Sequence, residues 1–177
     1  MCSTSLGDEA KPWSRDGTEI YFIGQTSGSN TVSYNGTTDE IDGFTAYGLG
    51  LGANEGHLGM NLEFLFGSTS DTWNGVAKYD ADIWFLNFNL DWNILKARLT
   101  PVITGGVGLL GMDGRNGDGS PYDETTFSCN LGAGLRWDIT DNIAVKVLYR
   151  STWAGFDYAD EWNQFDGVTA SIAYVFK

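Results

Sequence analysis

The residues best suited to bind a metal ion are carboxylates that lie close together in the chain. They are Asp113, Asp118, Asp123 and Glu124. Clustered carboxylates are the ligands that calcium prefers, so this segment is a candidate calcium site, and no other cofactor is indicated. The segment does not match an EF-hand, because Arg115 and Gly117 stand where that loop needs oxygen ligands. The alternative interpretation is a solvated acidic loop.

Nucleophilic and acid–base chemistry have little support. The single histidine, His57, follows the short polar stretch Asn54-Glu55-Gly56, where a structural role in a turn is the simpler explanation. The two cysteines, Cys2 and Cys129, are too few for a disulfide framework. Small polar residues follow Cys2, as they often follow the acylated cysteine of a mature lipoprotein, so lipidation at Cys2 is a separate hypothesis.

Alternation of apolar and polar residues is the strongest signal in the sequence, and it predicts β-strands. Large apolar residues occupy every second position in residues 58–66 and again in residues 84–92. Six further segments follow the same pattern, so we expect eight strands. Short turns are expected near residues 54–56, 93–96 and 140–142, and longer polar loops over residues 27–41, 68–78, 113–125 and 155–164.

An even number of strands, with short turns at one end and long loops at the other, is typical of a transmembrane β-barrel. We therefore predict an all-β fold, an eight-stranded antiparallel up-and-down barrel with short periplasmic turns and long acidic extracellular loops. Residues 1–16 are expected to form a flexible extension and residues 17–177 the barrel. The chain opens on Met1-Cys2-Ser3 without a secretory signal, so we interpret it as a mature form.

The direction of the apolar faces follows from the width of the barrel. Eight strands enclose an interior just wide enough for side chains. The apolar faces carry Trp, Phe, Leu and Met, which are too bulky for that interior, whereas the opposite faces carry mainly small and polar residues. We therefore expect the apolar faces to contact lipid and the polar faces to line the lumen.

Eight ionisable residues fall on the predicted inward faces. They are Glu19, Glu63, Asp91 and Asp138, with Arg98, Arg136, Lys146 and Arg150. Isolated buried charges are costly, so a lumen that holds four acids and four bases should pair them. The sequence thus predicts an interior closed by salt bridges rather than an open pore.

Aromatic residues gather near the ends of the predicted strands, on the lipid-facing side. They are Trp84, Trp92, Trp137, Tyr149, Trp153, Tyr174 and Phe176. Rings of Trp and Tyr at both membrane interfaces are typical of outer-membrane barrels. The alternative is that aromatic residues are simply favoured in strands.

Two segments resemble the small outer-membrane barrels of the OmpA/OmpX type. Residues 99–108 (LTPVITGGVG) are similar to the Pro-then-Gly-rich fifth strand of that family, and residues 172–176 (IAYVF) resemble its C-terminal assembly signal. The chain departs from that signal at Lys177, because the signal usually ends on the aromatic residue. The resemblance covers about residues 18–177 and implies insertion by the outer-membrane assembly machinery of a Gram-negative-type cell.

The resemblance leaves the function open, because one fold hosts many activities. The favoured hypothesis is a non-enzymatic barrel whose loops serve surface interaction, adhesion or envelope stability. The alternatives are a narrow channel for ions or small solutes, a lipid A-modifying acyl enzyme and a soluble lipocalin-type barrel. The enzyme is disfavoured because His57 belongs to a periplasmic turn, and the lipocalin because Lys11-Pro12-Trp13 is not its Gly-x-Trp motif.

The formal net charge of −13 is distributed unevenly. Fourteen of the 23 acidic residues, but only Lys78 and Arg115 among the ten basic ones, fall on the side of the long loops. Such a balance excludes nucleic-acid binding, which needs clustered Lys and Arg. The acidic rim should attract cationic or host-surface partners and should meet lipopolysaccharide only with the help of cations.

Overall fold

The computed structural model describes residues 14–34, 37–73, 77–115, 121–155 and 162–177. Nine strands are present in this part of the chain, and they are the only regular elements in it. They are β1 (Gly17–Tyr34), β2 (Thr37–Asp42), β3 (Thr45–Glu55), β4 (Leu58–Trp73), β5 (Ala77–Asn93), β6 (Leu99–Arg115), β7 (Pro121–Asp138), β8 (Ile143–Ala154) and β9 (Asn163–Phe176). The described residues include no helix long and apolar enough to cross a membrane.

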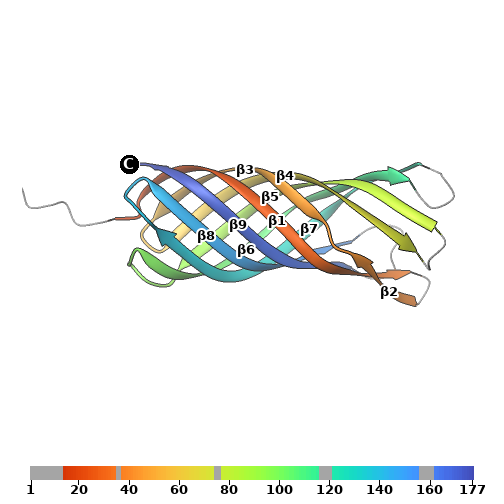
Figure 1. Ribbon diagram of the computed structural model, residues 1–177. Coiled ribbons are helices and arrows are strands. Elements are labelled where there is room, and N and C mark those ends of the chain that lie inside the picture. Colours follow the sequence, from red (N-terminus) through yellow and green to blue (C-terminus); the bar gives the residue numbers. More distant parts are fainter. Residues whose placement is uncertain (1–13, 35–36, 74–76, 116–120, 156–161) are drawn as a thin grey trace, which may run out of the picture.

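Eight of the strands close into an antiparallel barrel (Figure 1). β1 pairs with β3, each strand from β3 to β8 pairs with the next along the chain, and β1 pairs with β9 to complete the ring. Closure leaves the spanning part of the sheet without edges. The ninth strand, β2, pairs with the outer part of β1 and extends the barrel wall. The prediction of an eight-stranded up-and-down barrel is therefore confirmed.

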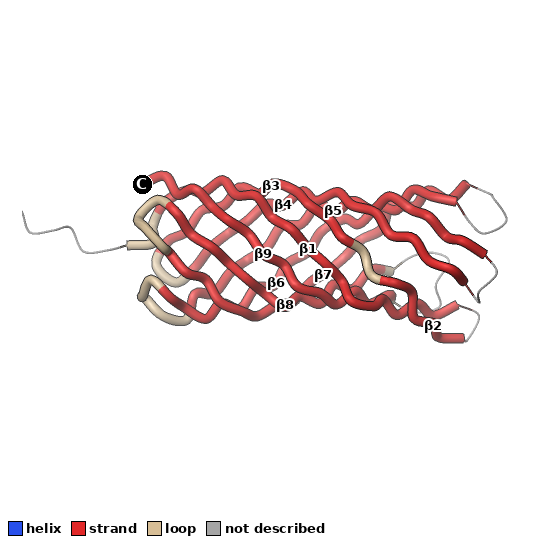
Figure 2. Tube along the Cα trace, in the orientation of Figure 1, coloured by secondary structure: helices blue, strands red, loops and turns tan. Residues whose placement is uncertain are grey.

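The two ends of the barrel differ (Figure 2). The short-turn end carries the turns at residues 56–57, 94–98 and 139–142, together with Ser14 and Lys177. At the opposite, long-hairpin end, much of the chain predicted to be loop is strand. For example, β4 continues to Trp73 and β6 to Arg115. The alternation of apolar and polar residues fades there while backbone pairing continues.

Large apolar side chains cover the outside of the barrel, as predicted. Leu51, Phe64 and Leu131 are 59%, 52% and 56% exposed, while Asn61 and Glu63 on β4 and Asn130 on β7 are buried in the lumen. The outward apolar surface also excludes a soluble lipocalin-type barrel, which would keep such side chains inside.

The lumen itself is not polar throughout. Toward the long-hairpin end it is filled by apolar residues, among them Ile23, Leu65 and Ile83. Three phenylalanines meet there, because the ring of Phe44 lies 5.2 Å from that of Phe85 and 6.1 Å from that of Phe165, centroid to centroid. The prediction of a small and polar interior is thus wrong for this layer. Strand alternation alone does not distinguish it, because Leu65 and Phe85 lie between residues that are also apolar.

Candidate functional site

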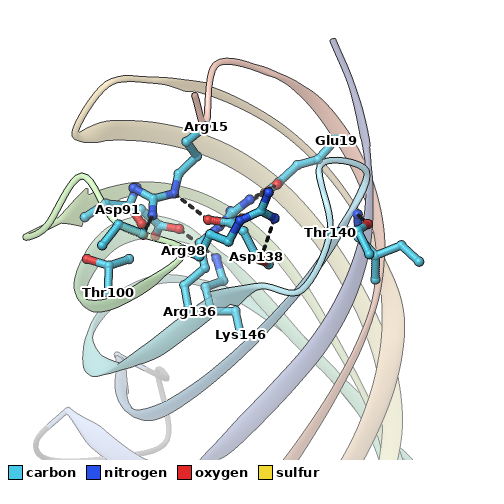
Figure 3. Close-up of polar contacts among 12 residues, drawn as sticks. Arg15, Glu19, Asp91, Arg98, Thr100, Arg136, Asp138, Thr140 and Lys146 are labelled. Carbon is cyan, nitrogen blue, oxygen red and sulfur yellow. Dashed lines mark hydrogen bonds and ion pairs between the residues drawn. The ribbon is translucent and has the colours of Figure 1, made fainter. Parts of the chain in front are cut away.

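The charged part of the lumen lies nearer the short-turn end. The layer closest to that end joins four side chains (Figure 3). Arg136 donates to both carboxylate oxygens of Glu19, with Nη2 2.8 Å from Oε2 and Nη1 3.2 Å from Oε1. Its Nε donates to Oδ1 of Asp138 at 3.0 Å. The other oxygen of Asp138 accepts from Nε of Arg15, also at 3.0 Å. All four residues are buried, and we call this group the lumen floor.

Arg15 is the member of the floor that sequence reasoning missed. It lies in the segment predicted to be a flexible extension, yet its side chain enters the lumen and donates to the backbone oxygens of Ala97, at 2.7 Å, and Leu95, at 3.4 Å. Alternation could not reveal it, because Arg15 precedes β1. The one available signal was its place two residues before the first strand.

Arg98 is a predicted lumen residue that lies outside the lumen. It was predicted to face the lumen, but its side chain is 45% exposed at the rim and pairs with Asp141 at 2.8 Å. The chain bends at residues 94–98 before β6 begins at Leu99, so the strand alternation does not extend back to Arg98. Among the described residues, the buried ion pairs join four acids and four bases, with Arg15 in place of Arg98.

Two further ion pairs lie above the floor. Nζ of Lys146 is 2.7 Å from Oδ2 of Asp91. Arg150 pairs with Glu63 through both Nη atoms, at 2.7 and 3.2 Å. The hydroxyl of Tyr21 donates to the same carboxylate at 3.2 Å.

Glycines give these long side chains room. A Cβ at Gly50 would collide with the ring of Tyr21, and one at Gly52 would lie 2.9 Å from Cγ of Glu19. On β6, a Cβ at Gly106 would collide with the amide of Asn89, which accepts a hydrogen bond from Nδ2 of Asn130 at 2.9 Å. Small residues facing large ones fill the narrow interior of an eight-stranded barrel, which explains the glycine-rich strands.

The arrangement holds charges in place rather than presenting a reactive group. Every acid of the network has a basic partner, and the charges of the network balance. Buried pairs of this kind gain little net stability, but removing one partner leaves a costly isolated charge. The network therefore connects β1, β4, β5, β7 and β8 across the lumen.

The predicted calcium ligands do not converge in the described part of the chain. Asp113 and Asp123 are neighbours in register and are exposed on the outer face. Glu124 occupies the alternate, inward position, and Asp118 lies outside the described residues. No group of three or more side chains that could hold a metal occurs among the described residues.

His57 has a structural role in the turn between β3 and β4. Its Nδ1 is 2.6 Å from the backbone oxygen of Asn93, and its own backbone oxygen accepts from the amide of Asn93 at 2.7 Å. The ring thus links the turn between β3 and β4 to the end of β5.

The seven predicted girdle residues all occupy outward-facing positions. Trp92, Trp137, Tyr149, Tyr174 and Phe176 are more than half exposed, while Trp84 and Trp153 are partly covered. Tyr174 and Phe176 stack edge to face, with ring centroids 4.9 Å apart. Their contact with membrane interfaces remains a prediction.

Comparison with known proteins gives a family and several similar folds. A family model described as "Outer membrane protein beta-barrel domain" matches residues 23–176. Neisserial surface protein A (NspA) has a similar structure, with a TM-score of 0.66 at 12% identity, covering 89% of this chain and 97% of that one. Ail, the attachment invasion locus protein of Yersinia pestis, has a TM-score of 0.59 at 14% identity, covering 91% and 99%.

The N-terminal β-barrel domain of Pseudomonas aeruginosa OprF is also similar, with a TM-score of 0.54 at 19% identity, covering 89% of this chain and 98% of that one. Identities this low establish the fold alone. No curated protein sequence matches this chain significantly.

Proposed function

Because the chain belongs to the outer membrane protein β-barrel domain family, we propose that it is a non-enzymatic protein of a Gram-negative-type outer membrane that binds cationic partners at the cell surface. The observation that carries this proposal is the acidic sheet at the long-hairpin end, which we assign to the extracellular side. The closed, salt-bridged lumen then serves as a rigid support for that surface.

The acidic sheet is formed by β4–β7 where they extend beyond the closed barrel. The ladder between β7 and β8 ends at Ser128 and Ala154, while β7 continues beside β6 as far as Pro121. Asp82, Asp113 and Asp123 are aligned in register on three adjacent strands, and all three are exposed. Like charges directly opposite one another destabilise a sheet, and a cationic partner would relieve this repulsion.

The charge of the sheet also indicates which ligands to expect. Ail has been solved in complex with the heparin analogue sucrose octasulfate, which is a polyanion. In this chain the extracellular side has fourteen acidic and two basic residues, so polyanions should be repelled. We therefore propose cationic peptides or protein surfaces as partners, attracted most strongly at low ionic strength. Lipopolysaccharide would approach this side through bridging cations, for which the loop with Asp118 remains a candidate calcium site.

The other proposed contacts are with lipid and the assembly machinery. The outward row Ile172, Tyr174 and Phe176 is about half exposed at the end of β9, as the resemblance to a C-terminal assembly signal requires.

The channel alternative is disfavoured because ion pairs and the phenylalanine layer fill the lumen. The lipid A enzyme is disfavoured because the single histidine belongs to a short turn at the periplasmic end.

Binding of a cationic probe by the full chain in lipid nanodiscs tests the proposal. We expect a polylysine peptide to bind in low salt and to dissociate as salt is raised, whereas a heparin fragment should not bind. Asp113→Asn with Asp123→Asn should weaken polylysine binding several-fold. The matched control is Glu55→Gln with Asp141→Asn, two acids at the opposite end, which should leave binding unchanged. Equal loss in both variants, or binding of heparin instead, would contradict the proposal.

A further inference from the structure

The turns at the periplasmic end differ in character. The turn between β3 and β4 contains Glu55, Gly56 and His57, which are polar or small. The turns between β5 and β6 and between β7 and β8 instead expose apolar side chains. Ile94, Leu95 and Ile139 are 43%, 49% and 43% exposed. An apolar side chain held in water forgoes the free energy that its burial would gain.

The backbone that carries Ile94 and Leu95 is held in place by hydrogen bonds. The amide of Ile94 donates to the backbone oxygen of Pro101 at 3.0 Å, and the amide of Leu95 donates to Oγ1 of Thr100 at 2.8 Å. The backbone oxygen of Leu95 also accepts from Arg15 of the lumen floor. The turn between β5 and β6 is thereby fixed on both sides.

The two apolar turns are also bound to each other. The amide of Asp138 donates to the backbone oxygen of Arg98 at 2.7 Å, and the Arg98 side chain pairs with Asp141 at 2.8 Å. They therefore form one rigid unit, which we call the apolar rim, defined by Ile94, Leu95, Ile139 and Ile143.

The apolar rim is continuous with the lipid-facing surface of the barrel. Ile94 follows the outward Trp92 by two residues, and Ile139 follows the outward Trp137 by two. The outward alternation thus continues past the tryptophans into both turns. Leu99 and Ile143, at the starts of β6 and β8, are exposed beside them. On the side of β3 and β4, by contrast, the apolar surface ends at Leu58, which is paired in register with Glu55 at the start of the turn.

We propose that the apolar rim is inserted into the phospholipid headgroup region of the inner leaflet, whereas the turn between β3 and β4 lies in water. The barrel is then seated asymmetrically, with its β5–β8 side deeper. The position of Lys96 agrees with this, because it is exposed next to Leu95 and long basic side chains reach from apolar surroundings to lipid phosphates. The proposal does not depend on the cationic partner proposed above.

The test uses the unmodified full chain in nanodiscs that contain phospholipid and no other protein. Methyl-labelled protein would be titrated with a water-soluble gadolinium chelate, which broadens NMR signals from groups exposed to water. In protein that is also labelled with 15N, we expect the backbone amide signals of Ile94, Leu95 and Ile139 to be broadened several-fold less than those of Glu55 and His57. The methyl groups of Ile94, Leu95 and Ile139 should show contacts with lipid protons. Equal broadening at both sites would overturn the proposal, because the rim would then face water or await a periplasmic protein.

A second measurement avoids dependence on signal assignment. A spin label is attached at Leu95→Cys or Ile139→Cys, with Glu55→Cys as the matched control, in a chain carrying Cys2→Ser and Cys129→Ser. Labels at 95 and 139 should collide more often with dissolved oxygen than with a water-soluble nickel chelate, and the label at 55 should show the reverse. The same preference at all three positions would contradict asymmetric seating.

Discussion

Arg15 and Asp138 are 123 positions apart in the chain, yet Nε of Arg15 lies 3.0 Å from Oδ2 of Asp138 inside the barrel. The contact joins the segment before the first strand to the end of β7, and through Arg136 it also includes Glu19 on β1. A residue outside the predicted barrel therefore completes the charge balance of the lumen.

Removing Arg15 should destabilise the protein more than removing Arg98. Arg15→Gln leaves Asp138 buried with Arg136 as its remaining partner, and losing one partner of a buried pair costs about 3 kcal/mol. Arg98→Gln breaks an exposed pair, which is worth about 0–1 kcal/mol. Unfolding of both variants by urea in lipid vesicles measures the difference. Equal losses would show that Arg15 is not part of the lumen network.

The pair of Glu63 and Arg150 should show strong coupling. Glu63→Met and Arg150→Met should each cost about 3–5 kcal/mol, because each leaves a buried charge without its counterion. The double variant should lose much less than the sum of the two, since an apolar pair has no charge to solvate. A double-mutant cycle of unfolding free energies measures this coupling, and additive losses would contradict it.

Neighbouring glycines on β6 should respond differently to alanine. Gly106 faces the lumen, where a Cβ would collide with Asn89 and with the backbone oxygen of Phe88, so Gly106→Ala should cost about 1–3 kcal/mol. Gly105 faces outward, and its Cβ would meet its nearest neighbour, Leu131, at 3.7 Å. Gly105→Ala is therefore the matched control and should be tolerated. Equal sensitivity at both positions would mean that the assigned facing of β6 is wrong.

The attachment of the segment before β1 should depend on pH in the acid range. Oδ1 of Asp16 accepts from the amide of Gly56 at 2.7 Å, and this bond lowers the pKa of Asp16 from its ordinary value of 3.8. A lowered pKa means that the interaction stabilises the fold above pH 3.8 and is lost as the pH falls through the lower, folded-state value. NMR titration of the Asp16 carboxyl and the Gly56 amide should show one common transition below pH 3.8, absent in Asp16→Ala.

The lumen should not conduct ions. Ion pairs at three levels and the contacts of Phe44 with Phe85 and Phe165 fill it, and apolar constrictions exclude ions by excluding water. Recordings in planar bilayers should show no reproducible single-channel steps with the full chain. Regular steps would support the channel hypothesis instead.

The sequence by itself determined the eight strands that close the barrel and the direction of their faces, but not β2 or the strand extensions at the long-hairpin end. The alternation from Leu58 to Phe66, for instance, indicates a strand with one face toward lipid and the other toward a crowded lumen. That signal depends only on the two-residue repeat of a strand, so it needs no knowledge of which strands are neighbours. It also placed Glu63, Asp91 and Arg136 in the lumen before any partner could be identified.

Only the tertiary structure decided which charges meet and where alternation stops. Arg98 follows a bend and turns to the rim, while Arg15 precedes a strand and enters the lumen, because chain direction outside the strands is set by long-range contacts rather than by a local repeat. The phenylalanine layer was hidden for the same reason, since Phe44 lies just before β3, Phe85 lies in β5 and Phe165 lies in β9. Their meeting depends on closure of the barrel, which brings together strands far apart in the sequence.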